Sequence, residues 1–430
     1  MKAESLTLPF TQQYLDYVGQ TEAPIFYHRW SCLSMVGAYL GRQFSFSHGH
    51  FNLHTNLYVM LIGDPGTRKS TAIKLAKKIL IQAGYETISA DKTSKEKFML
   101  DLAGEVEELP GGGKNKNQLV DTLLDDNYGW EGLEDENAAH EMYIACDEFN
   151  DFIGLGNLEF VSLLGNLWDF DGVFKNRIKT GKSVSINNPT VSILGGNTAT
   201  SFANAFPPET LGQGFFSRLL LIHGESTGKL ITFPKMPPME ATAEMVTALQ
   251  KIKTICTGKA TLTPEAEEAI DGIYKSYKPL EDQRFKFYAS RRLTHLLKLT
   301  LIIAATHYSK EITKDHVIEA NTILTHTETY MSKALGEFGR ARGSDITHKI
   351  MSILSSATMP MSISDLWPHL ASDLDKLSDL GAQVHKLLAA DKIQNVGSGK
   401  FLNKARRAVE VNSEYIDYKY LTTEERGMQL

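Results

Sequence analysis

The chain has 430 residues, of which 42% are hydrophobic and 22% are charged, and its net charge is -6 at pH 7. This length exceeds a single small core and predicts about two to three domains, and the acidic balance excludes a general affinity for nucleic acid. The widely spaced cysteines, Cys32, Cys146 and Cys256, exclude a disulfide framework or a structural zinc site. No segment resembles a signal peptide or a membrane span, so we expect a cytoplasmic protein without a membrane partner.

Residues 1–55 precede the first strong strand signal and carry a helical pattern. Phe26, Trp30 and Leu33 share the helical spacing, which ends near Gly41. We expect this segment to form a short helical collar that packs on the core.

The apolar run 57–62 has the length and side chains of a buried strand, and residues 70–83 have apolar side chains at helical spacing. The glycine-containing turn between them is typical of a P-loop, in which backbone N–H groups and a helix N-terminus face phosphates. The lysine of such a loop reaches the β- and γ-phosphates and its serine binds Mg²⁺. The residues expected to hold the nucleotide are Gly63, Asp64, Pro65, Gly66, Thr67, Arg68, Lys69, Ser70 and Thr71. The alternative is a tight strand-to-helix turn in which the lysine and serine are incidental.

The next segment is less regular. Residues 85–89 are strand-like, and a helix rich in Lys and Glu is predicted around 93–108. A glycine-rich, acidic stretch follows, and its low hydrophobicity predicts a mobile insertion near 109–140.

Asp147 and Glu148 follow a second apolar strand, at 142–146. In this position one carboxylate can hold Mg²⁺ and the next can polarise a water molecule for attack on a phosphate. We therefore assign Asp147, with Ser70, to the metal and Glu148 to the general base. The alternative is an ordinary solvated acidic turn.

A third strand is predicted at 190–194, and Asn197 follows it. Ligands of parallel sheets bind at the carboxyl edge, so Asn197 is expected to orient the attacking water or to sense the γ-phosphate. The alternative is an Asn selected for its turn-forming chemistry.

Two arginines come after this strand. Arg218 lies directly before a fourth strand at 219–222, and Arg291 lies at the start of a helix predicted at 293–307. Arginine can stabilise the charge of a transferred phosphoryl group, and an arginine at a helix start is favoured when an anion is present. Arg218 is therefore a candidate arginine finger from a neighbouring subunit, and Arg291 is a second candidate. Exposed arginines in ordinary surface positions are the alternative.

Residues 174–186 alternate about a turn at Thr180 and Gly181, which predicts a β-hairpin. Its cations are Lys175, Arg177, Lys179 and Lys182. Four cations on a short hairpin are suited to following a DNA backbone, although a solvated hairpin would have the same composition.

The rest of the chain divides into three parts. Residues 234–340 begin with a proline-rich linker and continue with a helical pattern. Residues 341–408 have three helical segments and a basic, strand-like end that includes Lys400, which is the pattern of a winged-helix domain. This unit could bind a DNA backbone or contact protein. We expect the tail, 409–430, to be a loose extension.

In this order, the motifs resemble those of the MCM-like branch of the AAA+ helicases, specifically the compact type found in phages and mobile elements. The P-loop corresponds to Walker A, Asp147 and Glu148 to Walker B, Asn197 to sensor 1, Arg218 to the arginine finger and Arg291 to sensor 2. The resemblance covers residues 56–335 and implies a lid at 234–340 and a DNA-binding hairpin before sensor 1. Arg68 departs from the small residue that the family usually has before the lysine.

The sequence therefore predicts an α/β fold with an AAA+ P-loop core and parallel sheet at 56–233, a helical lid, and a winged-helix domain. It also predicts an ATP- and Mg²⁺-dependent ring, expected to be a hexamer, that moves on DNA as a replicative helicase. If the protein is phage-encoded, it would act in the host cytoplasm. One alternative is an AAA+ initiator, loader or protein-remodelling switch without unwinding activity. Another is a DNA-binding protein whose P-loop is vestigial.

Overall fold

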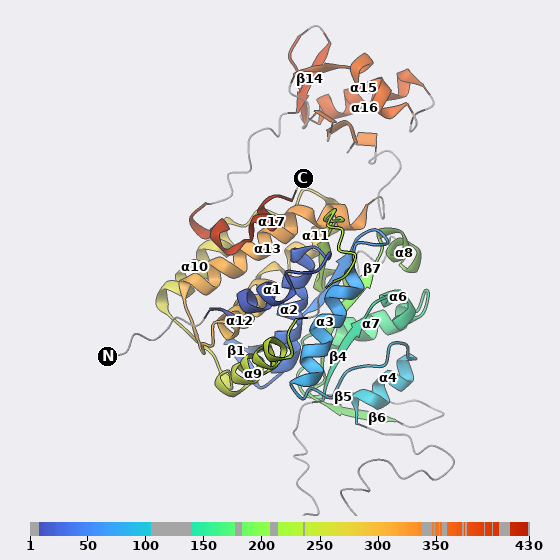
Figure 1. The fold of residues 1–430 in the computed structure, drawn as a ribbon. Coiled ribbons are helices and arrows are strands. Elements are labelled where there is room, and N and C mark those ends of the chain that lie inside the picture. Colours follow the sequence, from blue (N-terminus) through green and yellow to red (C-terminus); the bar gives the residue numbers. More distant parts are fainter. Residues whose placement is uncertain are drawn as a thin grey trace, which may run out of the picture. The chain divides into compact units, whose positions relative to one another are not determined.

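The computed structural model divides the chain into two compact units, one of Met1–Ala334 with Asp417–Leu430 and one of Leu335–Ile416 (Figure 1). It describes the chain except for residues 1–7, 105–139, 177–182, 207–213, 235–236, 337–345, 348, 352, 355–358, 372–373, 375, 391, 398, 404–412 and 429–430. The predicted insertion near 109–140 therefore lies almost entirely outside the described residues. The predicted collar and core belong to the first unit, as does the predicted lid up to Ala334, and the second unit overlaps the predicted 341–408 domain.

The first unit is built on a parallel sheet. Its strands are β3 (Tyr58–Ile62), β4 (Glu141–Cys146), β7 (Thr190–Asn197) and β8 (Leu219–His223), in the spatial order β4-β7-β3-β8. Almost all their side chains are buried, which explains why the sequence shows them as continuous apolar runs. The predicted parallel α/β fold is confirmed. β7 extends three residues beyond the prediction, and the predicted strand at 85–89 is only a parallel bridge between Ile88 and Tyr143.

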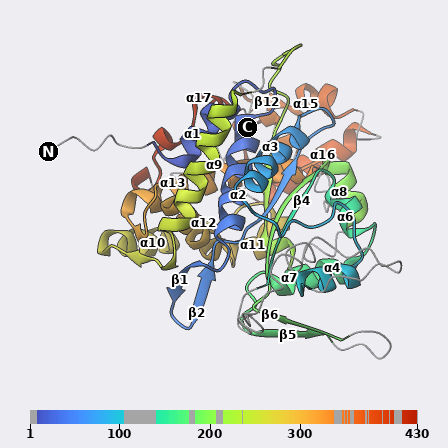
Figure 2. The same ribbon diagram turned by 60° about the horizontal axis from the view of Figure 1, so that its bottom comes forward.

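Helix α2 (Ile25–Leu40), in the predicted collar, is more deeply buried than a collar packed on the core requires, because every residue after Ile25 is buried. It packs against β3 and β7 of the sheet and against α3 (Lys69–Gln82) and α12 (Arg292–Thr306) (Figure 2). Trp30 also donates a hydrogen bond of 3.1 Å to Thr327 in α13 (Lys314–Leu335). The helix is thus an internal layer of the first unit, covered on several sides.

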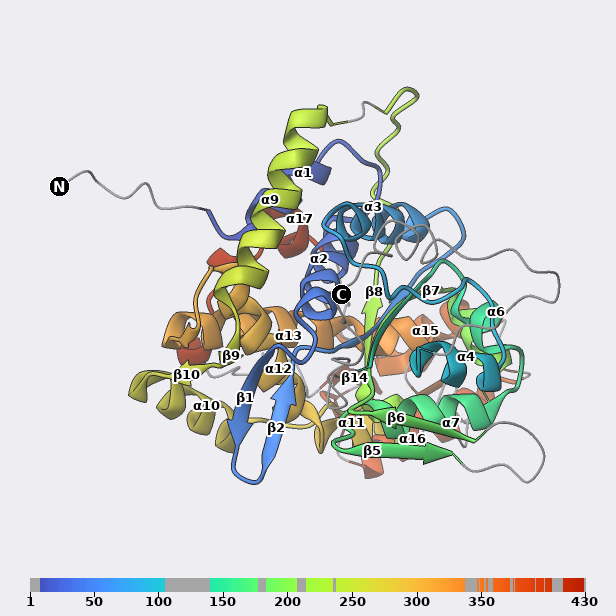
Figure 3. The ribbon, with the colours of Figure 1, turned by 90° about the horizontal axis from the view of Figure 1, so that it is seen from below.

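The remaining elements of the first unit are mostly helical, as predicted for the region after residue 239. The helices are α1 (Phe10–Val18), α4 (Lys95–Leu102), α6 (Phe149–Ile153), α7 (Leu158–Leu167), α8 (Ala199–Ala205), α9 (Met239–Ile255), α10 (Pro264–Ser276) and α11 (Lys286–Ala289), with short 3₁₀ turns η2 (Phe216–Arg218) and η3 (Gln283–Phe285). The small strands are β1 (Phe44–His48), β2 (Phe51–His54), β5 (Val173–Asn176), β6 (Val184–Asn187), β9 (Gly258–Lys259), β10 (Thr261–Leu262) and β11 (Glu311–Ile312). Strands β1 and β2 form a projecting antiparallel pair (Figure 3).

The second unit contains β12 (Met361–Ser362), α15 (Ile363–Leu370), α16 (Leu377–Ala389), β13 (Ile393–Asn395), β14 (Lys400–Asn403) and η5 (Ser413–Tyr415). Its three strands form an antiparallel sheet in the order β12-β14-β13. The helices and sheet enclose a separate apolar core that includes Leu366, Leu380, Val384 and Phe401. The predicted helices at 363–370 and 375–390 are present, as are the strands on either side of the predicted turn at 397–399.

Residues 417–428, which we call the return segment, are packed against the first unit. They contain η6 (Tyr418–Tyr420) and α17 (Thr423–Arg426). Glu425 is fully buried and forms an ion pair with Arg29 of α2, with Nε–Oε1 and Nη2–Oε2 distances of 2.5 and 2.7 Å. The predicted loose tail is therefore wrong for these residues, because a buried charge pair fixes them to the core.

All three cysteines are buried and unpaired. Within the described part of the chain, no helix combines the length and apolar character that crossing a membrane requires.

Candidate functional site

The P-loop leaves the end of β3 and leads into α3, as the sequence predicts. The side chain of Lys69 is folded back into this loop, and the residue is only 7% exposed. Its Nζ donates to the backbone oxygens of Gly63 and Asp64, at 2.7 and 3.0 Å, and to Thr67 Oγ1 at 3.3 Å. Burial lowers the pKa of Lys69, while the carboxylates of Glu148 and Asp64 oppose this shift. The ammonium is thus held inside the loop by neutral oxygens that an anionic ligand could replace.

Three positions of the loop restrict which residue can stand there, and one of them is Gly66, whose φ is 87°. A Cβ at Gly63 would meet Tyr27 Oη and the Gly224 oxygen, so only glycine fits there. Arg68 has a φ of 63° and a ψ of 27°, which is the left-handed region that favours glycine. Arg68, the residue that departs from the P-loop pattern, therefore has a backbone conformation that favours glycine.

The loop offers several N–H groups to a ligand. Thr67 donates its N–H to Asp64 at 3.2 Å, and Thr71 donates to Arg68 at 3.1 Å. We find no backbone acceptor within the described residues for the N–H groups of Gly66, Lys69 and Ser70, and no side chain caps the start of α3. An uncapped helix start with unpaired N–H groups fits a phosphate.

The acidic pair lies at the end of β4, beside the P-loop. Asp147 Oδ2 is 2.7 Å from Nζ of Lys74, an exposed residue of α3 that the sequence analysis did not single out. Burial raises the pKa of Glu148, the Lys69 ammonium lowers it, and Asp151 and Asp147 raise it further. Glu148 and Lys69 are thus close enough for the charge of each to shift the pKa of the other.

Asn197 is the last residue of β7, the strand next to β3, and its backbone oxygen accepts the N–H of Gly63 at 3.3 Å. Its side-chain Nδ2 donates to Asn150 Oδ1 at 2.7 Å, and its Oδ1 accepts from the N–H of Thr198 at 3.1 Å. Asn150 in turn donates to the Ser201 oxygen at 2.5 Å. The sequence analysis gave Asn150 no role, although it lies two residues after Glu148, and it links the ends of β4 and β7.

Within one chain, Arg218 does not lie at the carboxyl edge of the sheet, where Lys69 and Glu148 are found. It directly precedes Leu219, which pairs with Tyr58 at the start of β3, whereas the P-loop follows Ile62 at the end of β3. Arg218 donates to the Gly214 oxygen at 2.6 Å and lies over the ring of Trp168 at 5.7 Å. It is thus at the opposite edge of the sheet from Lys69.

Arg291 also lies near this opposite edge, because His295, one helical turn further on, has its Nε2 3.1 Å from the Ser217 oxygen. Burial lowers the pKa of Arg218, and the charge of Arg291 lowers it further. The neighbouring Arg292 is buried and forms an ion pair of 2.8 Å with Glu328, so it serves the core of the helical region. A groove of about 470 Å³ opens beside Arg218. Its lining residues are Leu158, Glu159, Ser162, Gly165, Asn166, Gly214, Phe215 and Arg218.

The predicted β-hairpin is present as the antiparallel pair β5 and β6, in which Lys175 pairs with Ser185 (Figure 3). Lys175 is exposed, and Val184 and Ile186 are buried, so the alternation follows the prediction. Arg177, Lys179 and Lys182 lie outside the described residues. In the second unit, Lys400 is exposed and pairs with Ser362.

The chain was also compared with known proteins. Neither a scan against protein-family models nor a search of curated proteins finds a match to this chain.

Proposed function

We propose that the protein is an ATPase of the AAA+ type. The observation that supports this most strongly is the convergence of Lys69, Ser70, Asp147, Glu148 and Asn197 around the carboxyl ends of three adjacent parallel strands. These side chains come from segments far apart in the sequence, and they include the groups that phosphoryl transfer to water requires.

Each residue has a distinct task in this proposal. The unpaired N–H groups of the loop and the Lys69 ammonium bind the phosphates of ATP. Ser70 and Asp147 hold Mg²⁺, which neutralises phosphate charge when it is bound. Glu148 accepts a proton from the attacking water, and its raised pKa suits a base that must gain and lose that proton. Asn197 orients the water, and Asn150 holds the Asn197 amide in place.

The proposal extends to a ring of identical subunits. Arg218 lies at the opposite sheet edge from the P-loop of its own chain, next to an open groove. A head-to-tail arrangement would bring Arg218 of one subunit to the ATP of the next, where it would stabilise transition-state charge, with Arg291 nearby. We take the ring to be a hexamer.

We further propose that this ring moves on DNA and unwinds it during replication. The β5–β6 hairpin would follow the DNA backbone with its cations, and the second unit would act as a winged helix whose Lys400 contacts DNA. The protein would then resemble compact MCM-like helicases of phages or mobile elements, acting in the cytoplasm.

The test is ATP hydrolysis with and without DNA, followed by unwinding of forked duplexes. Wild type is expected to hydrolyse ATP faster when single-stranded DNA is added, and Lys69→Ala is expected to abolish hydrolysis. The double variant Lys179→Ala/Lys182→Ala should retain basal hydrolysis but lose the stimulation by DNA. The matched control is Lys310→Ala/Lys314→Ala, which removes two exposed lysines elsewhere on the first unit.

The outcomes separate the proposed functions. Hydrolysis without stimulation or unwinding would contradict the helicase and favour an AAA+ loader or protein-remodelling switch. Absence of nucleotide binding would contradict the ATPase itself.

A further inference from the structure

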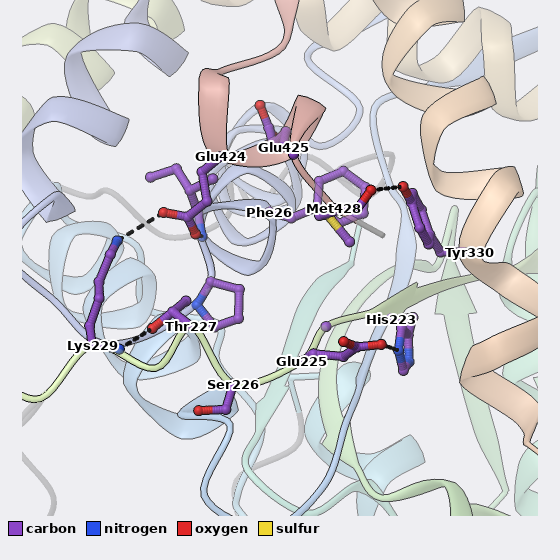
Figure 4. A pocket seen from close by; sticks show the side chains of 14 residues that line it. Phe26, His223, Glu225, Ser226, Thr227, Lys229, Tyr330, Glu424, Glu425 and Met428 are labelled. Atoms are coloured by element: carbon purple, nitrogen blue, oxygen red, sulfur yellow. Dashed lines mark hydrogen bonds and ion pairs between the residues drawn. The ribbon is translucent and has the colours of Figure 1, made fainter. Parts of the chain in front are cut away.

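A pocket of about 290 Å³ lies in the first unit, and its lining includes none of the residues assigned above (Figure 4). Four parts of the chain line it: the start of α2, the loop after β8, α13 and the return segment. The lining residues are Pro24, Ile25, Phe26, His223, Gly224, Glu225, Ser226, Thr227, Lys229, Tyr330, Glu424, Glu425, Gly427 and Met428.

The pocket adjoins the P-loop. Gly224, one of its lining residues, donates its N–H to the Ile62 oxygen at 3.1 Å. Tyr27 donates its hydroxyl toward both the Ile62 oxygen, at 2.8 Å, and the Gly224 oxygen, at 3.0 Å. Because Gly63 follows Ile62 and packs against Gly224, a ligand with its phosphates in the P-loop could extend toward this pocket.

The chemistry of the pocket does not suit a second anion. Each of its three carboxylates is already paired with a cation: Glu225 with Lys333, Glu424 with Lys229 and Glu425 with Arg29. Burial lowers the pKa of His223, and the nearby Glu225 opposes this shift. Acceptor oxygens suit the amino and hydroxyl groups of a nucleoside, which donate hydrogen bonds and carry no charge.

The return segment is built firmly into this pocket. Glu424 Oε1 accepts the N–H of Ile25 at 2.8 Å, and its Oε2 is 2.8 Å from Lys229 Nζ. The Tyr330 hydroxyl donates to the Met428 oxygen at 2.8 Å. Figure 4 shows Glu424 and Met428 on one side of the pocket and Glu225 and Ser226 on another. The buried ion pair between Arg29 and Glu425 also holds the return segment in place.

We propose that the return segment forms a wall of the nucleoside part of the nucleotide site, and that Glu424 is a specificity-determining residue there. This inference rests on the proposed ATPase function. Binding of a nucleoside and docking of the return segment are then thermodynamically linked. The factor by which the bound nucleoside favours docking equals the factor by which docking increases nucleotide affinity. The chain enters and leaves the second unit through α13 and the return segment, and residues of both line the pocket.

The experiment compares two probes on the full chain: a fluorescent ADP or ATP analogue, and inorganic tripolyphosphate, which has no nucleoside. Glu424→Gln is expected to weaken nucleotide binding by about tenfold, the loss of one charge-assisted hydrogen bond, and to leave tripolyphosphate binding unchanged. Glu414→Gln, an exposed position outside the pocket, is the matched control and should change neither affinity.

Hydrogen exchange supplies an independent measurement. Saturating ADP is expected to slow amide exchange in residues 418–427 of the wild type, whereas saturating tripolyphosphate is not. Equal nucleotide affinity in wild type and Glu424→Gln, equal loss for both probes, or unchanged exchange with ADP would each overturn the inference. If the wild type binds neither probe, the proposed ATPase function fails first, so the two failures are distinguishable.

Discussion

Arg68 of the P-loop and Glu22 of the turn before α2 form an ion pair, in which Nε and Nη2 of Arg68 lie 2.7 and 2.6 Å from Glu22 Oε2. The other oxygen of Glu22 accepts the N–H of Ile231 at 2.7 Å, in the segment after β8. The Ile231 N–H and then Arg68 lower the pKa of Glu22. The residue that departs from the P-loop pattern therefore connects the loop to two neighbouring segments.

Arg68→Gly and Arg68→Ala should differ in stability. Both lose the ion pair, which is exposed and contributes little. Only glycine relieves the left-handed backbone, whose cost for other residues is about 1 to 2 kcal/mol. We expect the glycine variant to unfold at a higher temperature than the alanine variant, as measured by near-ultraviolet circular dichroism. Equal melting temperatures would show that the backbone at this position relaxes in the variants.

Lys74→Ala should lower the Mg²⁺ concentration that ATP hydrolysis requires. Lys74 neutralises Asp147 in the structure, so it competes with a cation for that carboxylate. Because the pair is partly exposed, we expect the Mg²⁺ concentration for half-maximal ATP hydrolysis to fall by a factor of about 2 to 5. Lys78→Ala, one turn further along α3, is the control. If both variants shift the Mg²⁺ dependence equally, the effect comes from general charge.

Glu148→Gln should retain nucleotide binding and lose hydrolysis by a factor of about 10² or more. The base must be ionised to accept a proton, so wild-type activity should fall as the pH drops. Since burial raises the pKa of Glu148, this fall should begin above the usual glutamate value of about 4.3. The measurement is single-turnover hydrolysis against pH. Full turnover in Glu148→Gln would require another base.

Mixing Arg218→Ala subunits with Lys69→Ala subunits should restore part of the hydrolysis that each lacks alone. Where an Arg218→Ala subunit supplies an intact P-loop, a Lys69→Ala neighbour supplies an intact Arg218. The measurement is steady-state hydrolysis across a range of mixing ratios, with each variant alone as the control. A mixture with no recovered activity at any ratio would argue against a shared site.

Glu425→Gln should destabilise the first unit by about 3 kcal/mol, because Arg29 would remain buried without its charged partner. Replacing both residues by apolar ones, as in Arg29→Met/Glu425→Leu, should recover most of this loss. Denaturant unfolding of the three proteins measures the difference. A double variant less stable than Glu425→Gln would contradict this account.

The ion pair of Arg29 and Glu425 should also make the stability of the first unit depend on pH. Burial raises the pKa of Glu425, but the charge and hydrogen bonds of Arg29, together with hydrogen bonds from Thr422, lower it by more, so the net shift is downward. The contribution to stability is therefore complete above the unfolded-state pKa, about 4.3, and is lost as the pH falls through the folded-state value. The acid sensitivity should be reduced in the double variant.

The sequence predicts the strand β3, the turn after it and the helix α3 well because their signals are local. A continuous apolar strand, a glycine-containing turn and a helical period all lie within about 30 residues. The carboxyl edge of the sheet was also predictable, since parallel strands place Asp147 and Asn197 together. The side-chain partners were not, because Lys74 and Asn150 become neighbours of these residues only through tertiary packing.

The burial of α2 and the docking of residues 417–428 also escaped the sequence analysis. The mixture of acidic and tyrosine residues favoured a loose tail, and the partner of Glu425 is at the other end of the chain. One signal was present: Arg29 is the one Lys, Arg, Asp or Glu residue of helix α2, and a buried guanidinium needs an anionic partner. The sequence did not indicate which of the 51 acidic residues would supply it.

Arg29 and Glu425 are 396 residues apart, and this separation has a consequence for protein synthesis. The first unit cannot complete its core until residue 425 has left the ribosome. At elongation rates of about 5 to 20 residues per second, roughly 20 to 80 s pass between the synthesis of Arg29 and that of Glu425. During that interval the sheet, P-loop and second unit can form while the Arg29 charge stays unpaired, so this helix is where a nascent chain would most need chaperone protection.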